Sequence, residues 1–279
     1  MSQTPQISLT SLHKPTDKFV HSYKLCYKFQ PPKDPKESQS SQVKYTASQH
    51  ETTSPAKALP TVFSLRSKMA SILDQGNVGD CVSNAYALAI STMTLGPKQV
   101  NMSRLMNYAV ARVITGGTVV DDSGLYVADA ATCIAKYGVC QESAWPYNTN
   151  NFNILPPLNA FQSSKLFNKF TYTTVSQDLT SLKSCLVNKQ VPIIFGFMIY
   201  SSFMTNAVAK NGIVPMPDIA KEAVAGGHCT NIVGYDDTKQ WFICANSWGI
   251  SWGDRGYFYM PYAYMTNANL ASDFLFMYF

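Results

Sequence analysis

The spacing of hydrophobic and polar positions changes from a helical to a strand-like period partway along the chain. Apolar residues at helical spacing predict helices at 81–95, 103–114, 126–137 and 178–189. Asp80 is the predicted N-cap of the first helix, and Gly138 is the predicted C′ residue of the third. Short apolar runs then predict strands at 191–199, 228–235, 240–245 and 256–260. Helices early and strands late predict an α+β fold with two lobes and a cleft between them.

The first 58 residues have a different pattern. Apolar and polar side chains alternate between Tyr23 and Phe29, which predicts a strand. Residues 30–57 are rich in Pro, Ser, Lys, Gln and Thr, a composition typical of a flexible linker. The folded body is therefore predicted to begin near Leu59. We expect an N-terminal extension at 1–58 and a body at 59–279, with a helical lobe at 75–165 and a β lobe at 166–279.

Composition and charge narrow the class of protein. Hydrophobic residues make up 46% of the chain and charged residues 14%, which favours a globular protein over a disordered one. Residues 1–58 hold eight lysines and four acids, so most of the net charge of +5 lies there. The nearly neutral body argues against a nucleic-acid surface. No run of eighteen apolar residues predicts a membrane span, and no secretory signal is visible at the N-terminus.

The seven cysteines do not form a disulfide pattern. Their number is odd, and no two of them make a C-x-x-C pair. Cys133 and Cys140 would lie about 10 Å apart along a helix, which is too far to bridge. We expect reduced thiols, and hence an intracellular (cytoplasmic) location.

Two side chains stand out as a candidate catalytic pair. Three of the four histidines precede residue 59, so any imidazole base in the body must be His228. Taken alone, a histidine after two glycines is more often structural. Cys81 stands at the predicted first turn of a helix, where the helix dipole and an imidazolium lower a thiol pKa to roughly 3.5–7.5. Such a thiolate attacks carbonyl carbon, although a buried helix cysteine is the common alternative.

Further residues complete the set. Gln75 precedes Cys81 by six positions, so its amide could join the Cys81 backbone N–H in an oxyanion hole. Asn246 follows His228 by eighteen positions and could accept the second imidazole N–H, with Trp248 shielding that hydrogen bond from water.

Three segments carry a family resemblance: DQGNVGDCVSNA around Cys81, AGGHCTNIVGYDD around His228 and CANSWGISWGDRGYFYM around Asn246. Across residues 59–265 the chain resembles the papain-like (C1, cathepsin-type) cysteine peptidases, especially the branch seen in bacteria and large viruses. The resemblance implies a helical left lobe and a β-barrel-like right lobe. It also implies that Cys81 is the nucleophile, His228 the acid and base, Asn246 its orienting group and Gln75 an oxyanion donor.

The resemblance has further implications. No metal or cofactor is implied, and the expected partner is a protein or peptide substrate rather than nucleic acid or membrane. The substrate-side wall is expected at Asp122, Ser123 and Gly124. Gly196 and Gly226 are expected near the second subsite, with Leu125 or Tyr126 lining it, and Gly227 is expected to contact substrate. The absence of a histidine-bearing loop after Tyr147 favours an endopeptidase. Packaging in a virion becomes a second possible location.

The chain departs from the family pattern beside the nucleophile. Val78 and Val82 stand where the family signature has a cysteine and an aromatic residue. Asp80 places a carboxylate next to Cys81, where its charge should oppose thiolate formation.

Several interpretations remain open. We expect residues 1–58 to be an autoinhibitory segment whose stretch at 23–29 docks along the cleft wall near Gly124, and which is removed by cleavage between Gln30 and Leu59. The alternatives are a disordered tail or an extra strand outside the body. For the whole protein, the runner-up to a protease made as a zymogen is a catalytically silent, papain-like binding or structural protein. An acyltransferase that uses the same thiol is a third possibility.

Overall fold

The computed structural model describes residues 23–29, 44–47, 58–94, 101–165 and 170–279. Most of the predicted linker at 30–57, and the N-terminal residues 1–22, lie outside these ranges. Within the linker, Tyr45 is buried against the β lobe, and its backbone N–H donates to the Thr174 carbonyl at 2.8 Å. This short stretch is therefore packed against the body rather than free of it.

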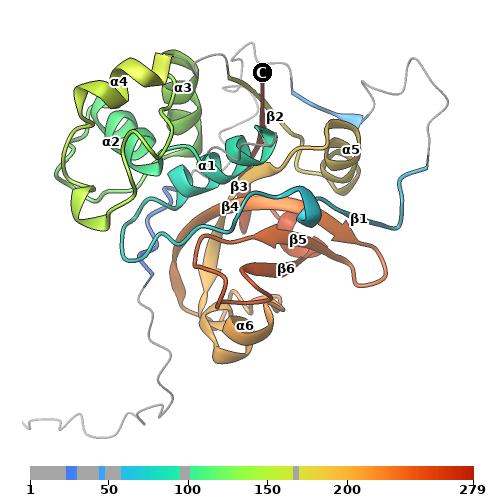
Figure 1. Ribbon diagram of the computed structural model, residues 1–279. Coiled ribbons are helices and arrows are strands. Elements are labelled where there is room, and N and C mark those ends of the chain that lie inside the picture. The colour runs from blue at the N-terminus through green and yellow to red at the C-terminus, as the bar shows by residue number, and fades with distance from the viewer. Residues whose placement is uncertain (1–22, 30–43, 48–57, 95–100, 166–169) are drawn as a thin grey trace, which may run out of the picture.

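Four helices form one lobe (Figure 1): α1 (Cys81–Met93), α2 (Arg104–Ile114), α3 (Val127–Tyr137) and α4 (Leu158–Ser164). Ser103 caps α2 by accepting from the Met106 N–H at 3.3 Å, and Gly138 ends α3 with a φ of 74°. Almost every residue of α1 is buried, which explains its continuous apolar sequence. The predicted positions of the first three helices are confirmed to within a few residues.

The predicted capping role of Asp80 is wrong. Asp80 occupies the N-cap position of α1, but its side chain makes no capping hydrogen bond. Its carboxylate instead accepts from Asn84 Nδ2 at 2.8 Å and from the Tyr147 hydroxyl at 3.0 Å. A side-chain amide one turn along and a distant phenol have replaced the local cap.

An antiparallel sheet forms the second lobe, in the strand order β2-β7-β3-β4-β5-β6, with β1 paired to β4. The strands are β1 (Val62–Ser64), β2 (Thr171–Thr174), β3 (Ile193–Tyr200), β4 (Val224–Asp236), β5 (Trp241–Ala245), β6 (Tyr257–Pro261) and β7 (Ala271–Tyr278). In the described part of the chain this path stays open rather than closing into a barrel. Around the sheet lie α5 (Leu179–Lys189), α6 (Asn206–Asn211) and α7 (Tyr262–Met265). No described helix has the length and hydropathy of a membrane span.

Helix α1 and strand β4 join the two lobes. Asn231 on β4 donates from Nδ2 to the Ala85 carbonyl of α1 at 3.1 Å. Two loops reinforce the contact, because Gln75 N–H donates to the Ser247 carbonyl at 2.9 Å and Gly249 N–H to the Leu73 carbonyl at 3.0 Å. The start of α1 is thereby held against β4 and the end of β5.

Residues 23–29 form no regular strand, contrary to the prediction from their alternation. They run between the two lobes, as the blue segment of Figure 1 shows. Tyr27 N–H donates to the Gly227 carbonyl of the β lobe at 3.1 Å, and Lys28 N–H donates to the Leu125 carbonyl of the helical lobe at 3.3 Å. The segment divides its backbone hydrogen bonds between two walls, so neither side builds a ladder with it.

Candidate active site

Cys81 and His228 lie on α1 and β4, the two elements that pack together between the lobes. Cys81 is the first residue of α1, and the backbone N–H of Cys229, the residue after His228, lies close enough to its sulfur to lower the pKa of the thiol. Neither Cys81 nor His228 has any exposed surface. The fold therefore places the two side chains that the sequence singled out on packed elements of opposite lobes.

The orientation of His228 is fixed by Asn246. His228 Nε2 lies 2.8 Å from Asn246 Oδ1, which also accepts from the Ser247 backbone N–H at 2.9 Å. Because Oδ1 is an acceptor in both contacts, Nε2 carries the hydrogen. In the neutral ring Nδ1 is then the basic nitrogen, and it has no hydrogen-bond partner among the described residues.

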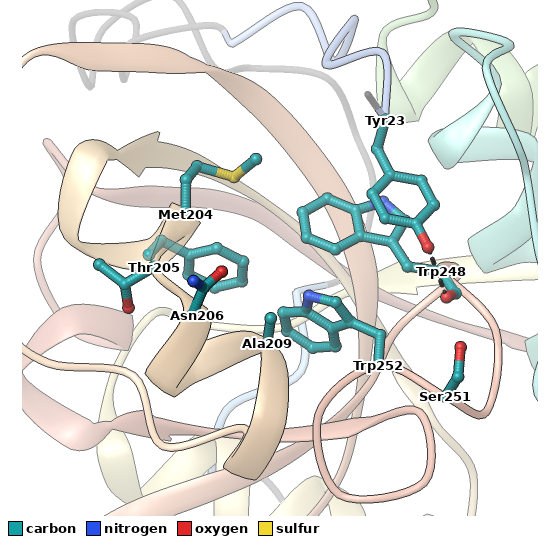
Figure 2. Close-up of a pocket in the computed structure, with 9 residues that line it drawn as sticks. Tyr23, Met204, Thr205, Asn206, Ala209, Trp248, Ser251 and Trp252 are labelled. Atoms are coloured by element: carbon teal, nitrogen blue, oxygen red, sulfur yellow. Dashed lines mark hydrogen bonds between the residues drawn. The ribbon is translucent and has the colours of Figure 1, made fainter. Parts of the chain in front are cut away.

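Aromatic rings shield this pair from water. The ring of Trp248 lies 4.8 Å from that of His228 at a 30° angle. Phe203 and Trp252 pack edge-on against Trp248 in turn. Figure 2 shows this group beside a pocket, with Tyr23 lying over Trp248. Trp248 thus lies against the ring of His228.

Gln75 is fixed by the same loop that carries Asn246. Its Oε1 accepts from the Ser247 hydroxyl at 2.7 Å, so Nε2 is the donor end of the amide. Nε2 donates to the Val78 carbonyl at 2.9 Å and lies 3.4 Å from the backbone carbonyl of Lys24. A peptide carbonyl from residues 23–29 thus sits against the amide that the sequence predicted as an oxyanion donor.

Burial keeps the candidate pair uncharged in this arrangement. Burial, reinforced by the Asp80 carboxylate, raises the pKa of Cys81 to about 12, although the Cys229 N–H opposes this shift. Burial also lowers the pKa of His228 to about 4, against the opposing hydrogen bond to Asn246. At neutral pH the site therefore holds a thiol and a neutral imidazole.

The expected substrate-binding glycines all lie against residues 23–29. A methyl group added at Gly124 would lie 1.7 Å from the Cys26 carbonyl oxygen, and one at Gly196 would lie 2.0 Å from Tyr27 Cζ. At Gly226 the added methyl group would lie 2.7 Å from Leu25 Cβ, and at Gly227 it would lie 2.3 Å from the carbonyl oxygen of Tyr27. The absence of side chains at these positions makes room for the segment.

The wall around Gly124 differs in detail from the expectation. Gly124 N–H donates to the Tyr108 hydroxyl at 3.1 Å, and the backbone acceptor that the wall offers is the Leu125 carbonyl. Tyr126 is the N-cap residue of α3, and its ring lies 5.3 Å from Lys28 Nζ. The wall thus contacts the segment through Gly124, Leu125 and Tyr126 together.

Known proteins with the same architecture identify the family. The family model for papain family cysteine proteases matches residues 59–277. An uncharacterised peptidase C1-like protein of Acanthamoeba polyphaga mimivirus is 36% identical over 234 residues, which are 78% of this chain and 74% of that protein. The chain belongs to the papain family of cysteine proteases.

Solved structures of papain-like proteases agree. Xylellain, a cysteine protease from Xylella fastidiosa, is 31% identical with a TM-score of 0.78, covering 91% of this chain and 96% of its own. A digestive procathepsin L 3 of Tenebrio molitor shares the fold at 21% identity, with a TM-score of 0.66 over 86% of this chain and 75% of its own. The viral and bacterial relatives confirm the predicted branch, and the protein is a thiol protease.

Two residues support this papain-like site in ways that the sequence did not predict. Ser247 links Gln75 to the Asn246 loop, and its place beside Asn246 was an available signal. Asp122, expected on the substrate-side wall, accepts from the Gly79 N–H at 3.0 Å and forms an ion pair with Lys24 at 2.7 Å. These two contacts were not predicted, because Gly79 and Lys24 are distant from Asp122 in the sequence.

Proposed function

We propose that the protein is a cysteine endopeptidase in which Cys81 is the nucleophile, His228 the acid and base, Asn246 its orienting group and Gln75 an oxyanion donor. The observation that carries this proposal is the 2.8 Å contact of His228 Nε2 with Asn246, which leaves Nδ1 as the basic nitrogen, without a hydrogen-bond partner among the described residues, on the strand that packs against the helix of Cys81. We also propose the division of the chain into an extension at 1–58 and a peptidase domain at 59–279.

The reaction follows from these positions. The Cys81 thiolate attacks a peptide carbonyl carbon, and the negative charge that moves onto the oxygen is held by Gln75 Nε2. The His228 imidazolium gives its Nδ1 proton to the leaving amine as the C–N bond breaks. Nδ1 then takes a proton from water, which attacks the acyl-enzyme and releases the acid product.

The same chain is proposed to be a zymogen in which residues 23–29 block the cleft. Tyr23 stacks on Trp248 with ring centroids 4.5 Å apart, and its hydroxyl donates to the Trp248 carbonyl at 2.9 Å (Figure 2). The Lys24 carbonyl lies at Gln75, and the Lys24 ammonium pairs with Asp122. We expect the segment, held at Trp248 and Gln75, to exclude substrate from the cleft and to remove the water that would stabilise the charged forms of Cys81 and His228.

The test of the catalytic pair uses the full chain with a recognition sequence for a site-specific protease inserted within residues 30–43, cut after purification. Cys81→Ala and His228→Ala should each lower kcat/KM for a fluorogenic peptide by at least about a thousandfold, since each removes a group that acts in every step. Cys133→Ala, a buried helix cysteine in the same lobe, is the matched control and should retain activity. Retention of most of the wild-type kcat by His228→Ala would disprove the assignment.

A further inference from the structure

The side chain of Tyr27 fills a pocket in the β lobe. Only 5% of Tyr27 is exposed, and its ring lies over Gly196 of β3, where any larger residue would overlap it. Its backbone is hydrogen-bonded to Gly227 of β4, as described above. Since residues 23–29 occupy the cleft in the proposed zymogen, the pocket becomes available to a substrate side chain once the segment leaves.

A carboxylate lies at the inner end of this pocket. The Tyr27 hydroxyl donates to Asp273 Oδ2 and lies 2.8 Å from the hydroxyl of Ser272. Ser272 also donates to Asp273 at 3.2 Å. The end of the pocket is therefore polar and carries a carboxyl group, whereas Gly196 and Gly227 form part of its walls.

The backbone is shaped to bring Asp273 there. Ile194 pairs with Leu275 but Gly196 pairs with Ser272, so Asp273 and Phe274 of β7 together oppose Phe195 of β3. This is a β-bulge, a feature that re-aims a side chain and is frequent beside active sites. Asp273 has a φ of 58°, in the left-handed region that glycine, asparagine and aspartate adopt more readily than other residues. A bulge that directs a carboxylate into a pocket is an arrangement expected of a binding site.

The charge of Asp273 is uncompensated. It makes no ion pair in the described part of the chain, and its side-chain partners there are the hydroxyls of Tyr27 and Ser272. Burial raises its pKa, while these two hydrogen bonds oppose the shift. An apolar side chain in place of Tyr27 would leave the carboxylate buried without a partner, whereas a guanidinium or ammonium would pair with it.

We propose that Asp273 is a specificity-determining residue that selects peptide substrates carrying arginine or lysine at the position that enters the Tyr27 pocket. This inference rests on the proposed peptidase function and names its substrate class. Tyr27 itself satisfies the carboxylate with one hydrogen bond but supplies no charge. It occupies the pocket because it is tethered to the body, which gives it a high effective concentration.

The test uses the cut full chain and peptides that differ only at the residue entering this pocket: Arg, Lys, Leu or Phe. We expect kcat/KM for the Arg peptide to exceed that for the Leu peptide by about tenfold or more, as for a hydrogen bond to a charged group. Asp273→Asn should bring this ratio close to one. Asparagine tolerates a positive φ, so the bulge should survive. Asp218→Asn, an exposed aspartate paired with Lys221, is the matched control and should keep the wild-type ratio.

A second measurement does not require substitution of Asp273. In the uncut chain, Tyr27→Lys and Tyr27→Met place side chains of similar length in the pocket, one charged and one apolar. An epoxysuccinyl peptide should label Cys81 about tenfold more slowly in the Lys variant, because the charged side chain holds the segment more tightly.

The outcomes separate the two levels of the proposal. Hydrolysis without preference for Arg over Leu, or with a preference that Asp273→Asn leaves intact, overturns the inference and leaves the peptidase function standing. A cut chain that hydrolyses none of the peptides, and whose Cys81 the epoxysuccinyl probe does not label, overturns the proposed function itself.

Discussion

Asp80 is a buried carboxylate beside the candidate nucleophile. Burial raises its pKa to about 7, against the lowering effects of Arg104 and the Tyr147 hydroxyl. Arg104 itself donates to the Asp74 carbonyl and to Asn84, so Asp80 belongs to a network that holds the loop before α1. The residue therefore contributes both to the shape of this loop and to the electrostatic field at Cys81.

This position gives a testable pH dependence. An ionised Asp80 disfavours a second negative charge on Cys81, so removal of the charge should lower the pKa of the thiol. Asp80→Asn keeps the shape and an acceptor for the Tyr147 hydroxyl. In the cut chain it should shift the acidic limb of the kcat/KM profile to lower pH to the extent that this limb lies near or above pH 7, where Asp80 is ionised. A limb that stays in place or moves upward would show that the carboxylate does not act on the thiol.

At the residue scale, the sequence indicated which side chains are candidates for catalysis more readily than it indicated how individual side chains are placed. A body with one histidine leaves a single choice of imidazole, and motif spacing then indicates Asn246 and Gln75. The cap at Asp80 was wrong because N-cap preference counts only local backbone donors, whereas Tyr147 is 67 positions away. Asp273 was missed because its position depends on a bulge that no local sequence pattern marks.

In the proposed zymogen, residues 23–29 control whether substrate and water reach Cys81 and His228. The segment is bound through contacts with both lobes. Its first described residue, Tyr23, stacks on Trp248 and donates a hydrogen bond to the Trp248 carbonyl. Tyr23→Ala in the uncut chain removes both contacts. Together they are worth about a tenfold change in occupancy, so labelling of Cys81 by an epoxysuccinyl peptide should accelerate by about that factor.

The matched control for this variant is Lys44→Ala, at an exposed position in the same extension. It should leave the labelling rate unchanged. Equal rates for Tyr23→Ala and wild-type chains would mean that the segment does not limit access to the thiol.

At the element scale, helices and central strands followed their periodicity, and the exceptions have physical causes. The alternation at 23–29 predicted a strand, but each of its two neighbouring walls accepts a single backbone hydrogen bond. Strand β7 was not predicted, and its bulge at Asp273 and Phe274 interrupts the alternation of its side chains. Its pairing with β2 and β3 is a long-range property that local spacing does not encode.

The whole molecule places the proposed catalytic groups on two packed lobes, with residues 23–29 running between the lobes. The lobes meet through α1 and β4, and the covering segment bonds to both (Figure 1). In this closed state Cys81 and His228 are buried and uncharged. Loss of the segment should hydrate the pair, lower the pKa of Cys81, raise that of His228 and so favour the thiolate–imidazolium form.

The most direct test of this account compares the uncut chain with the same preparation after cleavage within residues 30–43. Both are used at an enzyme concentration on the order of nanomolar. Before the cut, the linker holds the segment at an effective concentration on the order of millimolar. After the cut, the segment is present only at the concentration of the enzyme, so it should dissociate. We expect iodoacetamide to react with Cys81 slowly below high pH in the uncut chain, and readily near neutral pH after the cut, together with the appearance of peptide hydrolysis. Equal alkylation profiles and equal hydrolysis before and after a cut verified by mass spectrometry would contradict the account.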